Sequence, residues 1–196
     1  MKTALVLCIV LAFCGGLAVA QEPAAPATAG PPQYSLGDQT FSPTLGLLVP
    51  LFFMSWQPAA YATNLSPGAV LSLQIQPYLT PNIRLGGELA LLSAFSPNAN
   101  WLLEASLTAK ISYVISLYPF EIPLSLGAGV NWVKYLSDSA LDPLLKPSVS
   151  LFWIYNSSWS YGLNFTYWWD MQFSATPSES RVGNFLEISL SALYHY

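Results

Sequence analysis

The chain has 196 residues, of which 53% are hydrophobic and 8% are charged, and its formal net charge is −4. A soluble globule usually carries about a quarter of charged residues, so this composition indicates an exterior that faces something apolar. The six basic against ten acidic residues exclude the basic face that nucleic-acid binding requires.

The N-terminal residues predict an export signal. Lys2 supplies a positive charge, residues 4–13 are apolar, and Ala18-Val19-Ala20 has the small-x-small pattern of a cleavage site. We therefore expect residues 1–20 to be a signal peptide that is removed after Ala20. The alternative is a lipid anchor on Cys14, although the bulky Phe13 stands where a lipoprotein signal has a small residue. Both cysteines lie in this segment, so cleavage would leave no thiol for a disulfide or a metal site.

Residues 21–37 are rich in Pro and Ala and have neither a helical nor a strand period, which predicts a flexible periplasmic segment. After residue 20 there is no run of about 18 apolar residues, which excludes ordinary spanning helices. A closed barrel is the other structure that satisfies its backbone in lipid. Residues 38–196 alternate with period two, and we expect an all-β fold, an eight-stranded antiparallel up-and-down transmembrane β-barrel. Its predicted strands are 40–53, 70–79, 83–95, 101–117, 122–134, 145–155, 159–173 and 184–196.

The last strand carries the clearest pattern, because apolar residues occupy every second position from Leu186 to Ala192 and the chain continues to Tyr194 and Tyr196. A tilted strand needs roughly 9–11 residues to cross a bilayer. The ending resembles the C-terminal signal by which bacterial outer-membrane barrels are recognised for insertion. The resemblance implies an integral outer-membrane protein whose partners are outer-membrane lipid and the barrel assembly machinery. A terminal strand of a soluble sandwich is the alternative.

Connection lengths predict the orientation of the barrel. The links after the first, third, fifth and seventh strands are longer on average than the others, and outer-membrane barrels keep short turns in the periplasm. Both termini are therefore expected in the periplasm. Outward aromatic residues then fall into two belts: Phe53, Phe95, Trp101, Trp132, Trp169 and Phe173 near the outer rim, and Phe41, Tyr113, Tyr155, Trp159, Tyr161, Tyr194 and Tyr196 near the periplasmic rim. A soluble lipocalin-like barrel is an alternative with eight alternating strands, but it would need a charged outer face, and this chain has too few charged residues for one.

Function is expected inside the barrel, where polar and charged residues face inward. These residues are Arg84, Glu88, Glu104, Lys110, Lys146, Asp170 and Glu187, with His195 near the periplasmic end. Charges in a spanning region normally pair or face water. Because an eight-stranded barrel is barely wide enough for its own side chains, salt-bridged packing alone is an alternative role for them.

Near the outer end the inward positions are apolar and predict a hydrophobic vestibule that would capture a hydrophobic small molecule. They are Leu48, Phe52, Met54, Leu92, Leu102, Val133, Trp168 and Phe185. A hydrophobic plug made of the same residues is the alternative. Pro50 lies beside them inside the first strand and cannot donate to the ladder, which predicts a lateral seam; the alternative is that Pro50 only ends regular pairing.

The chain resembles the OmpW/OprG type of small eight-stranded outer-membrane barrel, and its scarcity of charge and its Pro/Ala-rich lead segment look like the small OmpW-like barrels of spirochaetes. The resemblance rests on the strand count, the terminal 186–196 pattern, the Thr44-Leu45-Gly46-Leu47 opening strand and the apolar vestibule. It implies a porin-like role in the passive passage or binding of small, mainly hydrophobic solutes, with lateral escape into the membrane and no cofactor or metal. The short loops and the Pro/Ala-rich segment depart from the family pattern.

Two other classes of function are alternatives for a barrel of this kind. A structural or adhesion barrel would bind extracellular partners through its external loops, at residues 55–68, 135–144 and 174–183. An outer-membrane lipid enzyme would need a His with a Ser and an acidic residue at the outer leaflet. The single His of the chain is His195, at the periplasmic end, so we expect no enzyme activity. The solute and the oligomeric state are left open by the sequence.

Overall fold

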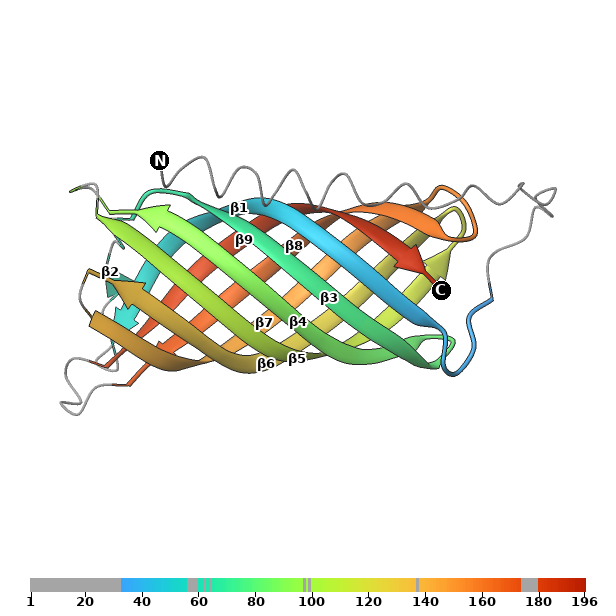
Figure 1. The fold of residues 1–196 in the computed structure, drawn as a ribbon, viewed down its shortest axis with the longest axis horizontal. Helices are drawn as coiled ribbons and strands as arrows, with labels where there is room; N and C mark the ends of the chain where they lie inside the picture. Colours follow the sequence, from blue (N-terminus) through green and yellow to red (C-terminus); the bar gives the residue numbers. More distant parts are fainter. Residues whose placement is uncertain are drawn as a thin grey trace, which may run out of the picture. The chain divides into compact units, whose positions relative to one another are not determined.

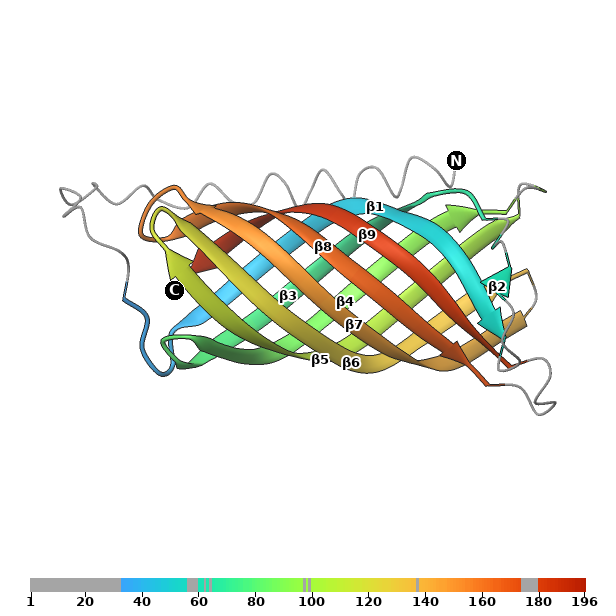
Figure 2. The same cartoon turned by 180° about the vertical axis from the view of Figure 1, so that it is seen from behind.

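In the computed structural model the described residues are 33–55, 60–61, 63, 65–96, 98, 100–136, 138–173 and 180–196. They form one antiparallel sheet whose first and last long strands pair, so the sheet closes into a barrel (Figures 1 and 2). The eight long strands are β1 (Gln39–Ser55), β3 (Gly68–Thr80), β4 (Ile83–Phe95), β5 (Trp101–Leu117), β6 (Phe120–Tyr135), β7 (Asp138–Ile154), β8 (Trp159–Gln172) and β9 (Arg181–His195). The two-residue strand β2 (Ala60–Tyr61) pairs with the end of β1. No helix in this described part is long and apolar enough to cross a membrane.

The predicted all-β barrel is confirmed, and two of its strands, 83–95 and 101–117, have their predicted bounds. The main difference is β7, which begins at Asp138 instead of residue 145. Residues 138–144 pair with the end of β6, from Tyr135 opposite Asp138 to Gly129 opposite Leu144. The predicted external loop 135–144 is therefore wrong, because its residues extend a hairpin. The predicted signal peptide, the alternative lipid anchor on Cys14 and residues 21–32 of the predicted flexible segment lie outside the described residues.

The first strand begins and the last strand ends at the same end of the barrel. The amide of Gln39 donates to the carbonyl of Tyr196 at 2.9 Å, and the amide of Tyr196 donates to the carbonyl of Gln39 at 3.0 Å. We call this the terminal end; the turns at 81–82, 118–119 and 155–158 lie there too, and the opposite end is the distal end (Figure 1). An even number of antiparallel strands returns the chain to the end where it began, as the sequence predicted.

Side chains alternate between the lumen and an apolar outer face along each long strand. In β5, for example, Leu107 is 61% exposed, whereas Thr108 next to it is 2% exposed. Exposed aromatic residues gather near both ends of the outer face: Phe95, Trp101 and Phe173 at the distal end, and Tyr113, Trp153, Tyr155 and Tyr161 at the terminal end. An outer wall of this kind suits a lipid environment.

Candidate functional site

Five side chains from five strands form a network across the middle of the lumen, which we call the central network. Lys110 Nζ of β5 donates to Glu88 Oε2 of β4 at 3.1 Å, and Lys146 Nζ of β7 donates to Glu88 Oε1. The same Lys146 Nζ lies 3.8 Å from the ring centroid of Trp168 on β8. Trp168 Nε1 in turn donates to Glu187 Oε2 of β9 at 2.8 Å. All five residues are buried, so pairing is what makes these charges tolerable in the lumen.

A second polar group lies toward the distal end and is acidic. Asn131 Nδ2 of β6 donates to Glu104 Oε2 of β5 at 2.8 Å and to Asp170 Oδ2 of β8 at 3.0 Å. Asp142 of β7 is the fourth buried member, and it stands opposite Asn131 in the ladder. Within the described residues, Asn131 Oδ1, Asp142 Oδ2 and Asp170 Oδ1 have no hydrogen-bond partner. The sequence singled out Glu104 and Asp170 but missed Asp142, which fell in the predicted loop.

Apolar residues fill the remaining distal lumen. One cluster joins residues that are at most 3% exposed: Leu48, Val70, Ala90, Leu92, Leu144, Trp168 and Phe185. A smaller cluster nearer the distal rim holds Ala94, Leu102 and Val133. Because these side chains bury one another, the structure has the plug arrangement and not the open vestibule, as the narrow bore of an eight-stranded barrel requires.

Of the predicted vestibule residues, six belong to these clusters and two do not. Phe52 is half-buried, and Met54 is 46% exposed near the end of β1. The assignment of Met54 to the lumen is therefore wrong, and so is that of Phe53 to the outer belt. The reason is the register shift between Pro50 and Phe52, which changes the alternation of β1, so that Phe53 packs against the lumen cluster. The predicted polar lumen residues Arg84, Glu88, Glu104, Lys110, Lys146, Asp170 and Glu187 are all buried inside.

The pairing of β1 is irregular at residues 49–52, which we call the β1 seam. The ladder between β1 and β3 ends where Leu48 faces Gly68, and for residues 49–52 the described residues give no partner on that side. On the other side, the register with β9 shifts between Pro50, opposite Phe185, and Phe52, opposite Asn184. Proline has no N–H for the ladder and is found at such bulges. The seam directly adjoins the apolar cluster, since Leu48 and Phe185 belong to that cluster.

The terminal half of the lumen is polar. Gln76 Nε2 donates to Ser112 Oγ at 3.0 Å, and Ser125 Oγ donates to the same oxygen at 2.8 Å. At the mouth, His195 Nε2 lies 3.5 Å from Ser160 Oγ, but His195 Nδ1 has no partner among the described residues. This pair therefore lacks the acidic third member that a nucleophilic serine requires. The part of the chain that the structure describes also holds no group of three or more His, Asp or Glu residues placed to bind a metal ion.

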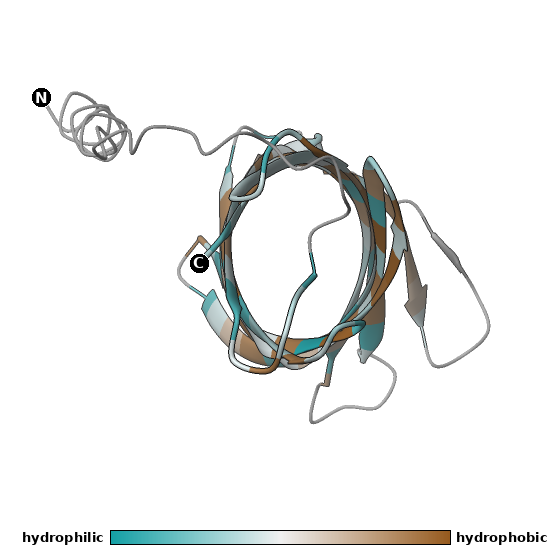
Figure 3. Cartoon of the chain, turned by 90° about the vertical axis from the view of Figure 1, so that its right-hand side faces the viewer, coloured by the Kyte–Doolittle hydropathy of each residue, from teal (hydrophilic) through white to brown (hydrophobic). Residues whose placement is uncertain are grey.

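Tyr34 enters this terminal mouth and was missed by the sequence reasoning. Its ring is stacked on the rings of both Tyr78 and His195, with centroid distances of 4.6 Å in each case. The end-on view shows the chain crossing the mouth before it enters β1 (Figure 3). Residues 33–37 thus differ from the flexible segment that their Pro/Ala-rich neighbours predicted, because an aromatic ring finds stacking partners there.

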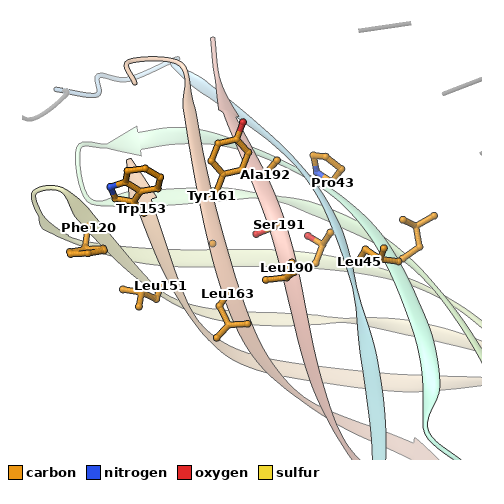
Figure 4. A pocket seen from close by; sticks show the side chains of 13 residues that line it. Pro43, Leu45, Phe120, Leu151, Trp153, Tyr161, Leu163, Leu190, Ser191 and Ala192 are labelled. Atoms are coloured by element: carbon orange, nitrogen blue, oxygen red, sulfur yellow. The ribbon is translucent and has the colours of Figure 1, made fainter. Parts of the chain in front are cut away.

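Grooves also occur on the outer wall. One groove of about 570 Å³ crosses β7, β8, β9 and β1 and is lined by exposed apolar side chains, among them Leu45, Leu151, Trp153 and Leu190 (Figure 4). These side chains point away from the lumen, so the groove belongs to the apolar outer face and not to the groups inside.

Comparison with known proteins shows which class of barrel this is. One protein-family model matches residues 21–194. A protein of Treponema pallidum (strain Nichols), described as uncharacterized, is 26% identical over 129 residues, which are 66% of this chain and 59% of that protein. The chain thus spans less than two thirds of that relative's length. A second such protein, from Borreliella burgdorferi, is 22% identical over 176 residues, covering 79% of this chain and 81% of that protein.

Solved structures with this fold are small outer-membrane barrels. Neisserial surface protein A matches with a TM-score of 0.62 and 9% identity, over 82% of this chain and 97% of that chain. The outer membrane protein OprG of Pseudomonas aeruginosa matches with a TM-score of 0.54 and 10% identity, over 85% and 99%. Ail, the attachment invasion locus protein of Yersinia pestis, matches with a TM-score of 0.52 and 14% identity, over 82% and 99%. Identities this low establish the fold alone.

Proposed function

The chain belongs to the family whose model matches residues 21–194, and we propose that it is an integral barrel of a bacterial outer membrane that binds and passes small, mainly hydrophobic solutes. The proposal includes the orientation with both termini in the periplasm, so that the distal end is external. It also includes kinship with OmpW/OprG barrels, which the fold shared with OprG supports.

The observation that carries the proposal is the position of the apolar cluster beside the β1 seam and above the central network. A hydrophobic solute that continued along the axis would have to pass the buried charges of Glu88, Lys110 and Lys146. Apolar surface set against these groups would disturb their pairing, which is costly in a buried place. A solute that moved sideways from the cluster would meet the apolar side chains of Leu48, Phe185 and Phe53 and the part of β1 whose pairing is irregular. The favourable route therefore leads from the external end to the outer leaflet.

Passage requires that the plug opens, because the cluster residues fill the lumen. Local opening needs the least free energy where few ladder hydrogen bonds hold the wall. The β1 seam is such a place, since residues 49–52 lack a described partner toward β3 and are bulged toward β9. The solute would thus displace side chains at the point where the wall can yield.

The remaining partners follow from the same proposal. Outer-membrane lipid covers the apolar outer face, including the groove in Figure 4. The barrel assembly machinery recognises the C-terminal strand through Tyr194 and Tyr196. The alternative, adhesion through external loops, loses one of its three predicted loops to the β6–β7 hairpin, and none of the described residues favours it.

The test replaces Pro50 by Val, which can restore a ladder hydrogen bond at the seam. One such bond contributes about 0.5–1.5 kcal/mol, so we expect a more stable barrel and an entry rate lowered by about two- to ten-fold. Entry is measured in bacteria that carry the chain in their outer membrane, from the fluorescence rise of N-phenylnaphthylamine. The matched control is Pro43→Val, which changes a proline of the same strand in the polar half of the barrel and should leave entry unchanged. Unchanged entry in a stabilised Pro50→Val barrel would show that Pro50 only ends regular pairing.

A further inference from the structure

The terminal mouth contains a slot whose width matches one aromatic ring. Its walls are Tyr78 of β3 and His195 of β9, and β1 runs between these two strands. Neighbouring strands are about 4.8 Å apart, so inward side chains on β3 and β9 stand about two strand spacings from each other. The inward residue of β1 between them is the short Thr40, which is buried. This leaves room for a flat group that stacks on both walls.

Tyr34 shows how the slot is filled. Its ring makes interplanar angles of 16° with Tyr78 and 9° with His195, so three rings stand nearly parallel. Its hydroxyl lies 3.3 Å from His195 Nε2. Burial raises the pKa of Tyr34, so its side chain stays a neutral phenol at ordinary pH. The slot therefore takes a phenol and offers a polar partner to its hydroxyl group.

Polar atoms without partners surround the slot. Within the described residues, Arg84 Nε and Nη1, Glu121 Oε2 and His195 Nδ1 have no hydrogen-bond partner, although Arg84 and Glu121 are at most 2% exposed. Arg84 lies next to the slot, with its guanidinium carbon 5.5 Å from the ring centroid of Tyr78. Buried polar groups in native proteins are nearly always satisfied. The Glu121 carboxylate interacts with the Arg84 charge and with the Tyr34 hydroxyl. The Arg84 donors that are left beside the aromatic slot therefore indicate a ligand with more polar groups than Tyr34 has.

We infer that this slot is a binding site for small phenolic compounds with an acidic substituent, and that Tyr34 is a tethered occupant that competes with them. The phenol ring stacks between Tyr78 and His195, and the acidic substituent accepts hydrogen bonds from the free Arg84 donors. Tyr34 lies only five positions before Gln39, where β1 begins, and so short a tether gives a group a millimolar effective concentration at its site. An external phenol therefore has to displace it. The site goes beyond the proposed passage of hydrophobic solutes and does not depend on it.

The experiment measures binding of 4-hydroxyphenylacetate to the full barrel in detergent micelles. Its carboxylate keeps the probe out of the micelle, and 4-hydroxycyclohexylacetate is the matched non-aromatic probe. Removal of the tethered competitor by Tyr34→Ala should tighten binding of the phenol by about tenfold or more, whereas Tyr34→Phe, which keeps the ring but loses the hydroxyl contact, should tighten it less than Tyr34→Ala does. The additional change Tyr78→Ala should abolish the gain. Tyr155→Ala, an exposed tyrosine at the same end, should have no effect.

A second measurement addresses the wild-type chain directly. Fluorotyrosine placed at position 34 should show an upfield ring-current shift in ¹⁹F spectra, and addition of the phenolic probe should move the signal toward that of free tyrosine. An unshifted signal in the wild type would overturn the role of Tyr34 as occupant. Equal binding of the phenolic and cyclohexyl probes to Tyr34→Ala, or no binding of either, would overturn the aromatic site. Both results are independent of whether any hydrophobic solute passes the seam.

Discussion

Two neighbouring positions of β5 allow a sharp test of which face of the barrel meets lipid. Leu107 is 61% exposed on the outer face, and Ser106 beside it is 1% exposed in the lumen. The same new residue, Lys, can be placed at either position. Leu107→Lys would put an ammonium group against lipid near the middle of a strand that runs from Trp101 to Leu117. Ser106→Lys would put the same group inside.

The expected magnitudes differ because the surroundings differ. A Lys or Arg on the lipid face near the bilayer midplane costs about 2–4 kcal/mol, which is roughly a 30- to 700-fold decrease in the folding equilibrium constant. At position 106 the ladder partner is Asn131, which is bonded to Glu104 and Asp170. Those carboxylates have no basic partner among the described residues, and Ser106 Oγ gives up no hydrogen bond. Ser106→Lys should therefore cost at least about 2 kcal/mol less than Leu107→Lys.

The assay is reversible unfolding in urea from phospholipid vesicles, followed by the shift in electrophoretic mobility between folded and unfolded barrel. Leu107→Met is the control that changes the shape of the side chain without adding a charge, and it should unfold near the urea midpoint of the wild type. Equal destabilisation by Lys at positions 106 and 107 would refute the assignment of faces, and with it the transmembrane reasoning.

Two further changes test the central network and the C-terminal strand. Glu88→Gln leaves the ammonium groups of Lys110 and Lys146 buried without a counter-charge and should lower the free energy of unfolding by about 3–5 kcal/mol, measured by the same urea titration. Adding Lys146→Met should recover part of that loss, and no recovery would show that Glu88 stabilises the barrel by packing alone. Tyr196→Ser should strongly reduce the folded barrel recovered from cell membranes, with Tyr196→Phe as the control that keeps the ring. The yield of refolding in vitro should change little, because the Tyr196 ring is 56% exposed. An equal loss of folded barrel in cells and in vitro would show that Tyr196 acts on the stability of the barrel and not on its recognition by the assembly machinery.

Local alternation was sufficient to predict the barrel, because the period of two decides which side chains share a face wherever the strand lies. The buried positions of Glu88, Lys110 and Lys146 followed from that period. The ion pairs between them did not follow from the period. The ladder partners of Glu88 are Gln74 and Thr108, whereas its ion-pair partner Lys146 lies on β7, on another part of the wall. Which charges meet across a lumen depends on the curvature and tilt of the closed sheet.

The two predictions that differ from the structure, the loop at residues 135–144 and the flexible segment around Tyr34, have a common cause. Residues 138–144 contain Asp138, Asp142 and Pro143, a composition typical of loops, yet they form strand because β6 offers a backbone partner along its whole length. Tyr34 was assigned to a flexible segment by its Pro/Ala-rich neighbours, but two rings from distant strands hold it. In each case a partner outside the segment itself, a neighbouring strand or a pair of rings, outweighed local propensity.

The sequence by itself determined the class of the protein. It has too little charge for a soluble surface, strands with one apolar and one polar face, and an even number of long strands. These properties are additive along the chain and can be read residue by residue. Only the tertiary structure decided that the apolar lumen residues pack as a plug, that the register of β1 against β9 shifts after Pro50, and that a ring from the N-terminal segment fills the terminal mouth. Those features depend on how far apart the strands stand once the sheet has closed, and that distance is a property of the whole barrel.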